Sequence, residues 1–253
     1  MLKAFFIGSG KLAVNLAHAF VNADIQISGV YSKTLLHANK FASQFQTTCF
    51  ESLQTIPKNC DIYFLAVNDS VIGTLSDQLK VKGIVVHCSG MISIGSLSAQ
   101  AHKGVFWPIQ SFSSERYADF RNIPICIEAF DEEDKRIIEA IADRISNNVI
   151  FVSEKERQNL HLAAVFVNNF SNHLFTLASN YLQKNKLNFD LLKPLILETV
   201  DKIQSIEPAL AQTGPACRHD FNTLVIHEAL LKDQPKILEI YRLLSSSIIE
   251  QTG

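Results

Sequence analysis

Residues 2–20 read LKAFFIGSGKLAVNLAHAF, and this stretch decides the fold. The apolar run that ends at Ile7 predicts a buried strand, and the apolar residues from Leu12 to Phe20 recur at helical spacing. Between them lies Gly8-Ser9-Gly10-Lys11-Leu12-Ala13, which has the pattern G-x-G-x-x-A. Gly8 permits a tight turn, Gly10 lets the backbone approach a ligand, and Ala13 lets the helix pack closely on the strand. A strand, such a loop and a helix together form a diphosphate-binding element, so we expect a dinucleotide-binding βαβ unit.

The same alternation of strands and helices continues along the chain to about residue 153. Apolar runs predict strands at 25–31, 61–67, 83–88, 104–109, 123–128 and 148–152, and amphipathic stretches predict helices at 35–45, 70–79 and 131–146. Beyond that point only helical periods occur, at 154–183, 191–210, 221–231 and 235–250. The sequence therefore predicts an α/β protein: a Rossmann-type doubly wound, mostly parallel sheet over 1–153, followed by an all-α domain over 154–253.

The end of the second strand indicates the type of dinucleotide. NAD-binding proteins usually have a carboxylate here for the ribose hydroxyls, whereas this chain reads Val30-Tyr31-Ser32-Lys33-Thr34. A hydroxyl at Ser32 beside the ammonium of Lys33 suits a 2′-phosphate, so we expect NADP. The alternative is that Lys33 is a solvated surface charge.

Ligands of open parallel sheets bind beyond the carboxyl ends of the strands. Two predicted strands end in Val67-Asn68-Asp69 and His87-Cys88-Ser89-Gly90, and we expect the two loops to border the cofactor. Ser89 is also a candidate substrate ligand, whereas His87 is interpreted as a core histidine. The segment Phe106-Trp107-Pro108-Ile109-Gln110-Ser111-Phe112 either lines the substrate pocket, with Ser111 as a ligand, or packs a domain interface.

Two polar clusters in the predicted helical domain are candidate substrate and catalytic groups. In the first, His161 shares a helical stripe with Asn168, and Asn169 lies beside it. Such a stripe faces either an active cleft or a dimer interface. The second cluster contains Arg218, Asp220, Thr223 and His227 around a Gly-Pro turn. Asp220 is also a good N-cap for the helix that follows it, and Arg218 is either a carboxylate anchor or a plain surface charge.

Composition limits which binding partners and which cellular compartment we expect for the protein. The net charge of −2 favours neither nucleic acid nor an anionic membrane, and no apolar run is long enough to span a bilayer. The five cysteines are odd in number and scattered, so we expect no disulfide framework, no metal site and a reducing cytoplasm.

Several motifs carry a family resemblance over essentially the whole chain. GSGKLA, LAVND, HCSG, FWPIQSF and especially TGPACRHD followed by Thr223 and His227 resemble an uncharacterised bacterial family. That family joins a Rossmann-like domain to a C-terminal helical domain of unknown function, and is related to pyrroline-5-carboxylate reductase, ketopantoate reductase and the β-hydroxyacid dehydrogenases. The resemblance implies an NADP-dependent or deazaflavin-dependent oxidoreductase and a homodimer formed through the helical domain. The β-hydroxyacid dehydrogenases place a catalytic Lys one helical turn before an Asn at the start of the helical domain. Here the residues four before Asn168, Asn169 and Asn172 are Ala164, Val165 and Asn168, so no such Lys is present and that mechanism does not carry over.

These observations predict a reductase that moves hydride between NADPH and a C=O or C=N carbon of a small, anionic metabolite. A histidine is the natural proton donor near neutral pH. We expect His227 first and His161 second in that role, with Arg218 anchoring an acidic group and Asn168 or Asn169 orienting the reacting group. The alternatives are a non-catalytic dinucleotide sensor and a deazaflavin-dependent reductase.

Overall fold

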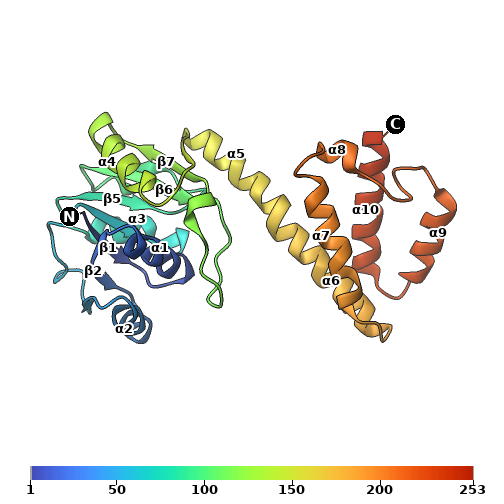
Figure 1. Ribbon diagram of the computed structural model, residues 1–253, viewed down its shortest axis with the longest axis horizontal. Coiled ribbons are helices and arrows are strands. Elements are labelled where there is room, and N and C mark those ends of the chain that lie inside the picture. The colour runs from blue at the N-terminus through green and yellow to red at the C-terminus, as the bar shows by residue number, and fades with distance from the viewer. Residues whose placement is uncertain (1, 253) are drawn as a thin grey trace. The chain divides into compact units, whose positions relative to one another are not determined.

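The computed structural model describes residues 2–252 and divides the chain into two compact units, Met1–Asn169 and Phe170–Gly253 (Figure 1). The first unit contains one sheet of eight strands in the order β3-β2-β1-β4-β5-β6-β7-β8. Its strands are β1 (Lys3–Ile7), β2 (Gln26–Tyr31), β3 (Cys49–Phe50), β4 (Ile62–Leu65), β5 (Ile84–His87), β6 (Lys103–Pro108), β7 (Ile125–Ala129) and β8 (Val149–Phe151). The predicted Rossmann-type α/β fold is confirmed.

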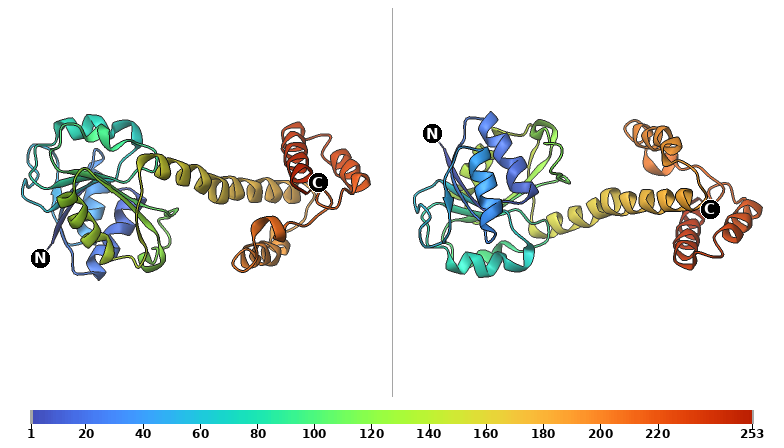
Figure 2. Two further views of the ribbon diagram at one scale, coloured as in Figure 1. Left: turned by 90° about the horizontal axis from the view of Figure 1, so that it is seen from above. Right: turned by 90° about the horizontal axis from the view of Figure 1, so that it is seen from below.

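The strands alternate their side chains between two apolar layers, which helices cover on both faces of the sheet (Figure 2). Phe6 and Phe64 pack on one face under α1 (Lys11–Asn22), α2 (Leu35–Gln44) and α4 (Glu132–Asp143). Phe5 and Tyr63 pack on the other face with α3 (Ile72–Gln78) and η2 (Ile94–Leu97). Two further short 3₁₀ helices, η1 (Asp69–Val71) and η3 (Phe120–Asn122), complete the connections.

Strand direction changes once across the sheet. β1, β2, β4, β5 and β6 run parallel, so their carboxyl ends meet at one edge. β7 runs antiparallel to β6, pairing Trp107 with Cys126, and β8 runs parallel to β7. β8 is therefore antiparallel to β6, and its last residue, Phe151, pairs with Ile127 and lies level with Phe106 in the middle of β6.

A continuous helical stretch follows β8. Helix α5 (Glu154–Ala164) begins with a capping box in which Ser153 and Glu156 bond reciprocally. A π-helix, η4 (Val165–Phe170), comes next, and α6 (Ser171–Lys184) follows it directly. The wider π turn changes the spacing of side chains between His161 and Asn168, so regular helical periodicity does not hold across the expected stripe.

The second unit contains α6 and four more α-helices with one 3₁₀ helix. These are η5 (Phe189–Leu192), α7 (Lys193–Lys202), α8 (Pro208–Ala211), α9 (Phe221–Leu230) and α10 (Pro235–Thr252). The single helix expected over 191–210 is wrong: it breaks after Lys202 and restarts at Pro208, whose ring disfavours helical backbone in the residue before it. The predicted domain limit at residue 153 stays a prediction. No helix among the described residues combines the length and apolarity that a bilayer crossing requires.

Candidate functional site

The loop between β1 and α1 has the geometry of a phosphate-binding turn. Gly8 has φ +107°, and a Cβ there would lie 2.1 Å from the carbonyl oxygen of Ala66, so only glycine fits. Gly10 is the N-cap of α1, and a Cβ there would meet no described atom within 4 Å. Among the described residues no side chain caps α1. The amides of its first turn are therefore available to an anion, and the helix dipole favours negative charge there.

The other predicted cofactor residues of the loop differ in how exposed they are. Ala13 is fully buried, as close packing of α1 on the sheet requires, while Leu12 is half-buried. Ser9 is half-buried and Lys11 is exposed. Beyond β2, Ser32 is half-buried and Lys33 is exposed, so both are accessible to a ligand.

A hollow of about 260 Å³ lies beside this loop. Ser9, Gly10 and Lys11 line it together with two basic residues of α2, His37 and Lys40. Sequence reasoning missed His37 and Lys40, although they are three residues apart within the predicted helix 35–45, and this spacing indicates a shared basic face. The hollow therefore brings basic side chains to the N-terminus of α1, where the backbone amides have no side-chain cap.

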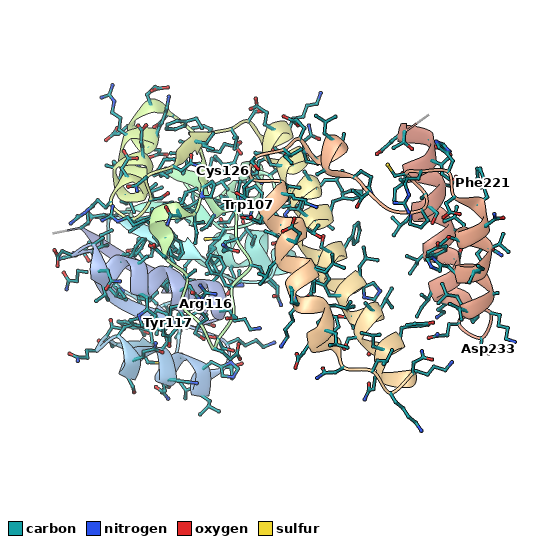
Figure 3. The ribbon with its side chains drawn as sticks, turned by 45° about the vertical axis from the view of Figure 1, so that its right-hand side comes forward. Trp107, Arg116, Tyr117, Cys126, Phe221 and Asp233 are labelled. Carbon is teal, nitrogen blue, oxygen red and sulfur yellow. The ribbon has the colours of Figure 1, made fainter. Side chains whose placement is uncertain are left out.

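The loop that follows β6 forms the far wall of this hollow through Ser113, Ser114 and Tyr117, and Figure 3 shows Tyr117 beside α2. Asn15 holds the loop: its side chain is buried, donates to the carbonyls of Lys11 and Ser113, and accepts from the Ala118 amide. Glu115 on the same loop has a lowered pKa, chiefly because the Ser114 hydroxyl donates to it and also because Lys11 is near. A bound phosphate would compete with this carboxylate for Lys11.

The loop after β4 contributes the next candidate residues. Val67 is half-buried, whereas Asn68 and Asp69 are exposed at the carboxyl edge of the sheet. Asp69 accepts a hydrogen bond from the Ser89 hydroxyl at 2.8 Å, which joins the ends of β4 and β5. The two predicted cofactor loops therefore lie side by side.

Ser89 is held by all of its polar groups. Its hydroxyl accepts from the amides of Met91 and Ile92, its amide donates to Nδ1 of His87, and its carbonyl accepts from Arg157. Ser89 is only 7% exposed, so its observed role is to shape the loop.

His87 is a buried histidine with one satisfied nitrogen. Burial, followed by the charge of Arg157, lowers its pKa to about 4, while the Ser93 backbone acts weakly in the other direction. Within residues 2–252, Nε2 has no hydrogen-bond partner of ordinary geometry. His87 is therefore neutral near pH 7, and its Nδ1 can accept from the Ser89 amide.

His161 lies against the ends of β5 and β6. Its ring centroid is 5.7 Å from that of Trp107, and a Cβ on Gly90 would lie 2.6 Å from its Nδ1. Gly90 is therefore required for the approach of this imidazole. Trp107 is buried and the His161 side chain is half-buried, so Trp107 forms part of the site that contains His161. Ser111, past the end of β6, is exposed.

Of the remaining candidates in the first unit, Asn168 and Asn169 are both exposed in the π-helix η4. π-Helical turns occur often at functional sites. Their predicted role in orienting the reacting group stays a prediction.

The second unit groups the remaining candidates around α9. Asp220 caps this helix by accepting from the amide and the hydroxyl of Thr223, and these bonds lower its pKa. The Nδ1 of His227 lies 2.9 Å from the Tyr241 hydroxyl, in an apolar pocket of about 330 Å³. Arg218 is exposed. The structure thus places His227 and His161 in different units, and the substrate and catalytic roles of Arg218, Asp220, Thr223 and His227 stay predictions.

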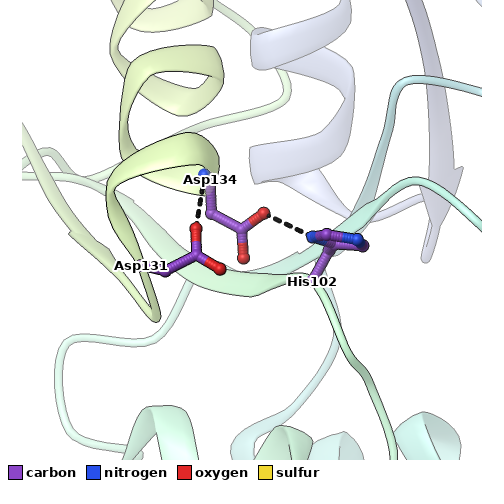
Figure 4. Close-up of side chains that lie close together, drawn as sticks. All are labelled: His102, Asp131 and Asp134. Carbon is purple, nitrogen blue, oxygen red and sulfur yellow. Dashed lines mark hydrogen bonds and ion pairs between the residues drawn. The ribbon is translucent and has the colours of Figure 1, made fainter.

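A cluster of His102, Asp131 and Asp134 has oxygen and nitrogen atoms close enough for a metal ion, but structural contacts already use its carboxylates (Figure 4). Asp134 pairs with Nδ1 of His102 at 2.9 Å and accepts from the Lys103 amide, while Asp131 caps α4. His102 precedes β6, so the cluster lies at the edge opposite the glycine loop.

The eight-stranded sheet and its uncapped glycine loop define a Rossmann-type dinucleotide-binding protein. Comparison with known families extends this: residues 3–89 match the family described as "NADP oxidoreductase coenzyme F420-dependent", and residues 123–248 match a "Domain of unknown function (DUF2520)". The chain belongs to the family that combines these two parts.

Solved structures agree with this assignment. A candidate NADP oxidoreductase from Bacteroides fragilis is 38% identical, with a TM-score of 0.93 and 98% of each chain covered. A pyrroline-5-carboxylate reductase from Streptococcus pyogenes is 13% identical, with a TM-score of 0.66, 99% of this chain and 98% of that chain covered. The pyrroline carboxylate reductase of Plasmodium falciparum, with NADP bound, is 14% identical, with a TM-score of 0.60, 100% of this chain and 98% of that chain covered. No curated protein matches the chain. The chain therefore has the fold of NADP oxidoreductases, and the pyrroline-5-carboxylate reductases share this fold.

Proposed function

We propose that the protein is a reductase that transfers hydride between NADP(H) and a C=O or C=N carbon of a small, anionic metabolite. One observation carries the proposal: the carboxyl edge of a single sheet holds both an uncapped, open glycine loop and the imidazole of His161. The first suits a dinucleotide diphosphate, and the second supplies a proton-transfer group where nicotinamides bind in this fold.

The residues of the first unit suit NADP in particular. The α1 amides would hold the diphosphate, and Lys33, His37 and Lys40 would offset the additional phosphate on the adenosine ribose. When bound, the nicotinamide supplies the hydride. The chain then has to position the ring, exclude water and deliver one proton to the reduced atom.

His161 is the proton donor that the geometry favours. Its half-buried imidazole lies over Gly90 and Trp107, at the ends of the central strands. His227, the other candidate, already bonds Tyr241 within the second unit. We therefore place His161 ahead of His227 for this role.

The cofactor part is tested by calorimetry with NADPH and NADH on the purified protein. Replacing Lys33 and Lys40 together by Ala should weaken NADPH binding roughly tenfold and leave NADH binding within about twofold, because only the phosphate is lost as a partner. Lys58→Ala removes an exposed lysine distant in sequence from the hollow and serves as the control. Equal affinity for the two cofactors in the unaltered protein would contradict the NADP preference, and no binding of either would end the proposal.

The catalytic part is tested by screening keto acids and cyclic imines for NADPH oxidation. With a substrate found, His161→Gln should lower kcat by about 10²-fold or more while NADPH affinity stays unchanged. His173→Gln, at an exposed histidine of α6, is the matched control. The family description also favours a deazaflavin as the second reactant, so the screen includes one. NADPH binding without turnover of any compound would favour a dinucleotide sensor.

We further propose a homodimer through the second unit. Helix α9 is apolar on more than one side: Leu224 is buried, whereas Val225 is 68% and Ile226 60% exposed. Large apolar side chains on α7 and α10, including Leu197 and Leu243, are also exposed. Exposed apolar side chains gathered on neighbouring helices indicate an interaction surface, and a second copy of this unit offers the matching apolar surface.

A further inference from the structure

The first turns of α5 are fastened to the loop that follows β5. The Ser93 hydroxyl donates to Glu154 at 2.6 Å, Arg157 donates to the Ser89 carbonyl at 3.1 Å, and Gln158 donates to the Met91 carbonyl at 3.1 Å. Residues 154, 157 and 158 share one helical face. This face of α5 is therefore hydrogen-bonded along the loop that we expect to border the nicotinamide.

Arg157 is the unusual member of this set because its side chain is fully buried. Its guanidinium pairs with Glu128 of β7, with Nη2 3.0 Å and Nε 3.4 Å from Oε2, and Nη1 reaches Ser89. Burying such a charge is costly, and a well-packed apolar pair in its place is often as stable. A buried arginine here is therefore better explained by the geometry that it imposes than by the stability that it adds.

The geometry that Arg157 imposes concerns Ser89 and His161. Ser89 is gripped through its amide by His87 and through its carbonyl by Arg157. His161 is four residues after Arg157, on the same side of α5, and packs on Gly90. One rigid planar group thus fixes both the loop and the turn of helix that presents His161.

We propose that Arg157, oriented by Glu128, is a positioning residue that sets the distance between the His161 imidazole and the Ser89–Gly90 turn. The proposal deepens the proposed function and rests on it for the role of His161. Lysine cannot replace Arg157, because a single ammonium lacks the planar fork that reaches Glu128 and Ser89 together.

Trp107 gives a readout that needs no substrate. A protonated imidazole in contact with an indole quenches its fluorescence, Trp107 is the chain's only tryptophan, and His161 contacts it. The other groups near this contact are the always-charged Arg157 and His87, whose pKa of about 4 keeps it neutral above pH 5. We expect Trp107 to fluoresce less with His161 in place than after His161→Gln, and this difference, measured in each variant background, is the fluorescence step.

The test compares Arg157→Lys, Arg157→Gln and the milder Glu128→Gln with Arg136→Gln, which alters an exposed arginine of α4. Thermal unfolding identifies the variants that fold, and Glu128→Gln keeps a neutral acceptor in case both Arg157 variants fail. In each folded variant at Arg157 or Glu128 the fluorescence step should shrink at least about twofold, and kcat should fall roughly tenfold or more at an unchanged KM for NADPH. Arg136→Gln should change neither.

The outcomes separate the two proposals. An unchanged step and unchanged kcat in Glu128→Gln and in the folded Arg157 variants would overturn the positioning role. Loss of the step in these variants, combined with full turnover in His161→Gln, would retain the positioning of His161 and refute its catalytic role. A change in the KM for NADPH alone, with kcat and the fluorescence step unchanged, would also overturn the proposal.

Discussion

Single glycines in the first loop perform separable tasks. A Cβ at Gly8 would collide with the Ala66 backbone at a positive φ, whereas a Cβ at Gly10 would enter open space. The first is thus a requirement of folding and the second a requirement of ligand approach. The G-x-G-x-x-A pattern alone does not distinguish these two roles, because the neighbour of Gly8 is Ala66, which follows β4 and lies more than fifty residues away in the chain.

Gly8→Ala and Gly10→Ala should therefore fail in different assays. We expect Gly8→Ala to lower the free energy of unfolding by about 2 kcal/mol or more, because positive φ and a backbone clash both act against it. Gly10→Ala should unfold like the unaltered protein in urea and bind NADPH at least roughly tenfold more weakly in calorimetry. Equal stability losses in the two variants would contradict this division.

Residues that the sequence did not single out complete the candidate site. Asn15 carries no feature of a loop-holding residue until Ser113 and Ala118 are brought to it by the fold. Arg157 likewise reads as an ordinary helix-surface charge, because its partner Glu128 is 29 residues away in the chain. Helical and strand periodicity describe local exposure, so partners of this kind emerge only from tertiary structure.

At the scale of elements, the capping box of α5 is accessible to direct measurement. The Ser153 hydroxyl and amide bond the Glu156 carboxylate, and these bonds lower its pKa. A carboxyl with a depressed folded-state pKa stabilises the fold fully above its unfolded-state pKa, and this contribution is lost as pH falls through the folded-state value.

Ser153→Ala should cost about 1 kcal/mol of stability at pH 7. The difference from the unaltered protein should shrink as the pH falls through the lowered folded-state pKa of Glu156, because the carboxyl is then protonated in both proteins. Urea unfolding at pH 7 and pH 3.5 measures both values. A difference that grows on acidification would show that the box does not act through the carboxylate.

Most elements of the first unit could be predicted from local sequence, and the exceptions have physical causes. The apolar runs at β4 and β5 identify strands that are covered on both faces. β3, at only Cys49–Phe50, is too short to show a period. The reversal of β7 was also hidden, because apolar runs carry no information about direction, and the sequence pattern likewise gave no sign of the π turn in η4.

At the scale of the whole molecule, the second unit has little core of its own. Its buried apolar residues are Ala216, Leu224 and Leu231, whereas many leucines and isoleucines of its helices are exposed. A unit of this size usually needs a larger core or a partner to be stable. We therefore expect the second unit to bury its exposed apolar side chains against a second copy of itself.

Val225→Glu should therefore convert a dimer into monomers, because it introduces a charge into the apolar surface of α9. Sedimentation velocity at about 10 μM measures the mass, and Lys232→Glu, close in sequence but already polar, is the control. A monomeric unaltered protein would contradict the homodimer. NADPH affinity should be the same in the variant, because the glycine loop belongs to the first unit.

The attachment of α5 to the loop after β5 has a consequence for how the protein tolerates insertions. Glu154 and Arg157 already bond this loop, and His161 follows Arg157 by about one helical turn. The helix then acts as a ruler: one residue inserted between Arg157 and His161 would carry the imidazole about 1.5 Å along and about 100° around the axis. Inserting a full turn would restore its direction but overshoot by about 5 Å. Length variation among related chains should therefore accumulate in the loop after β6 or beyond η4, and spare the seven residues between Ser153 and His161.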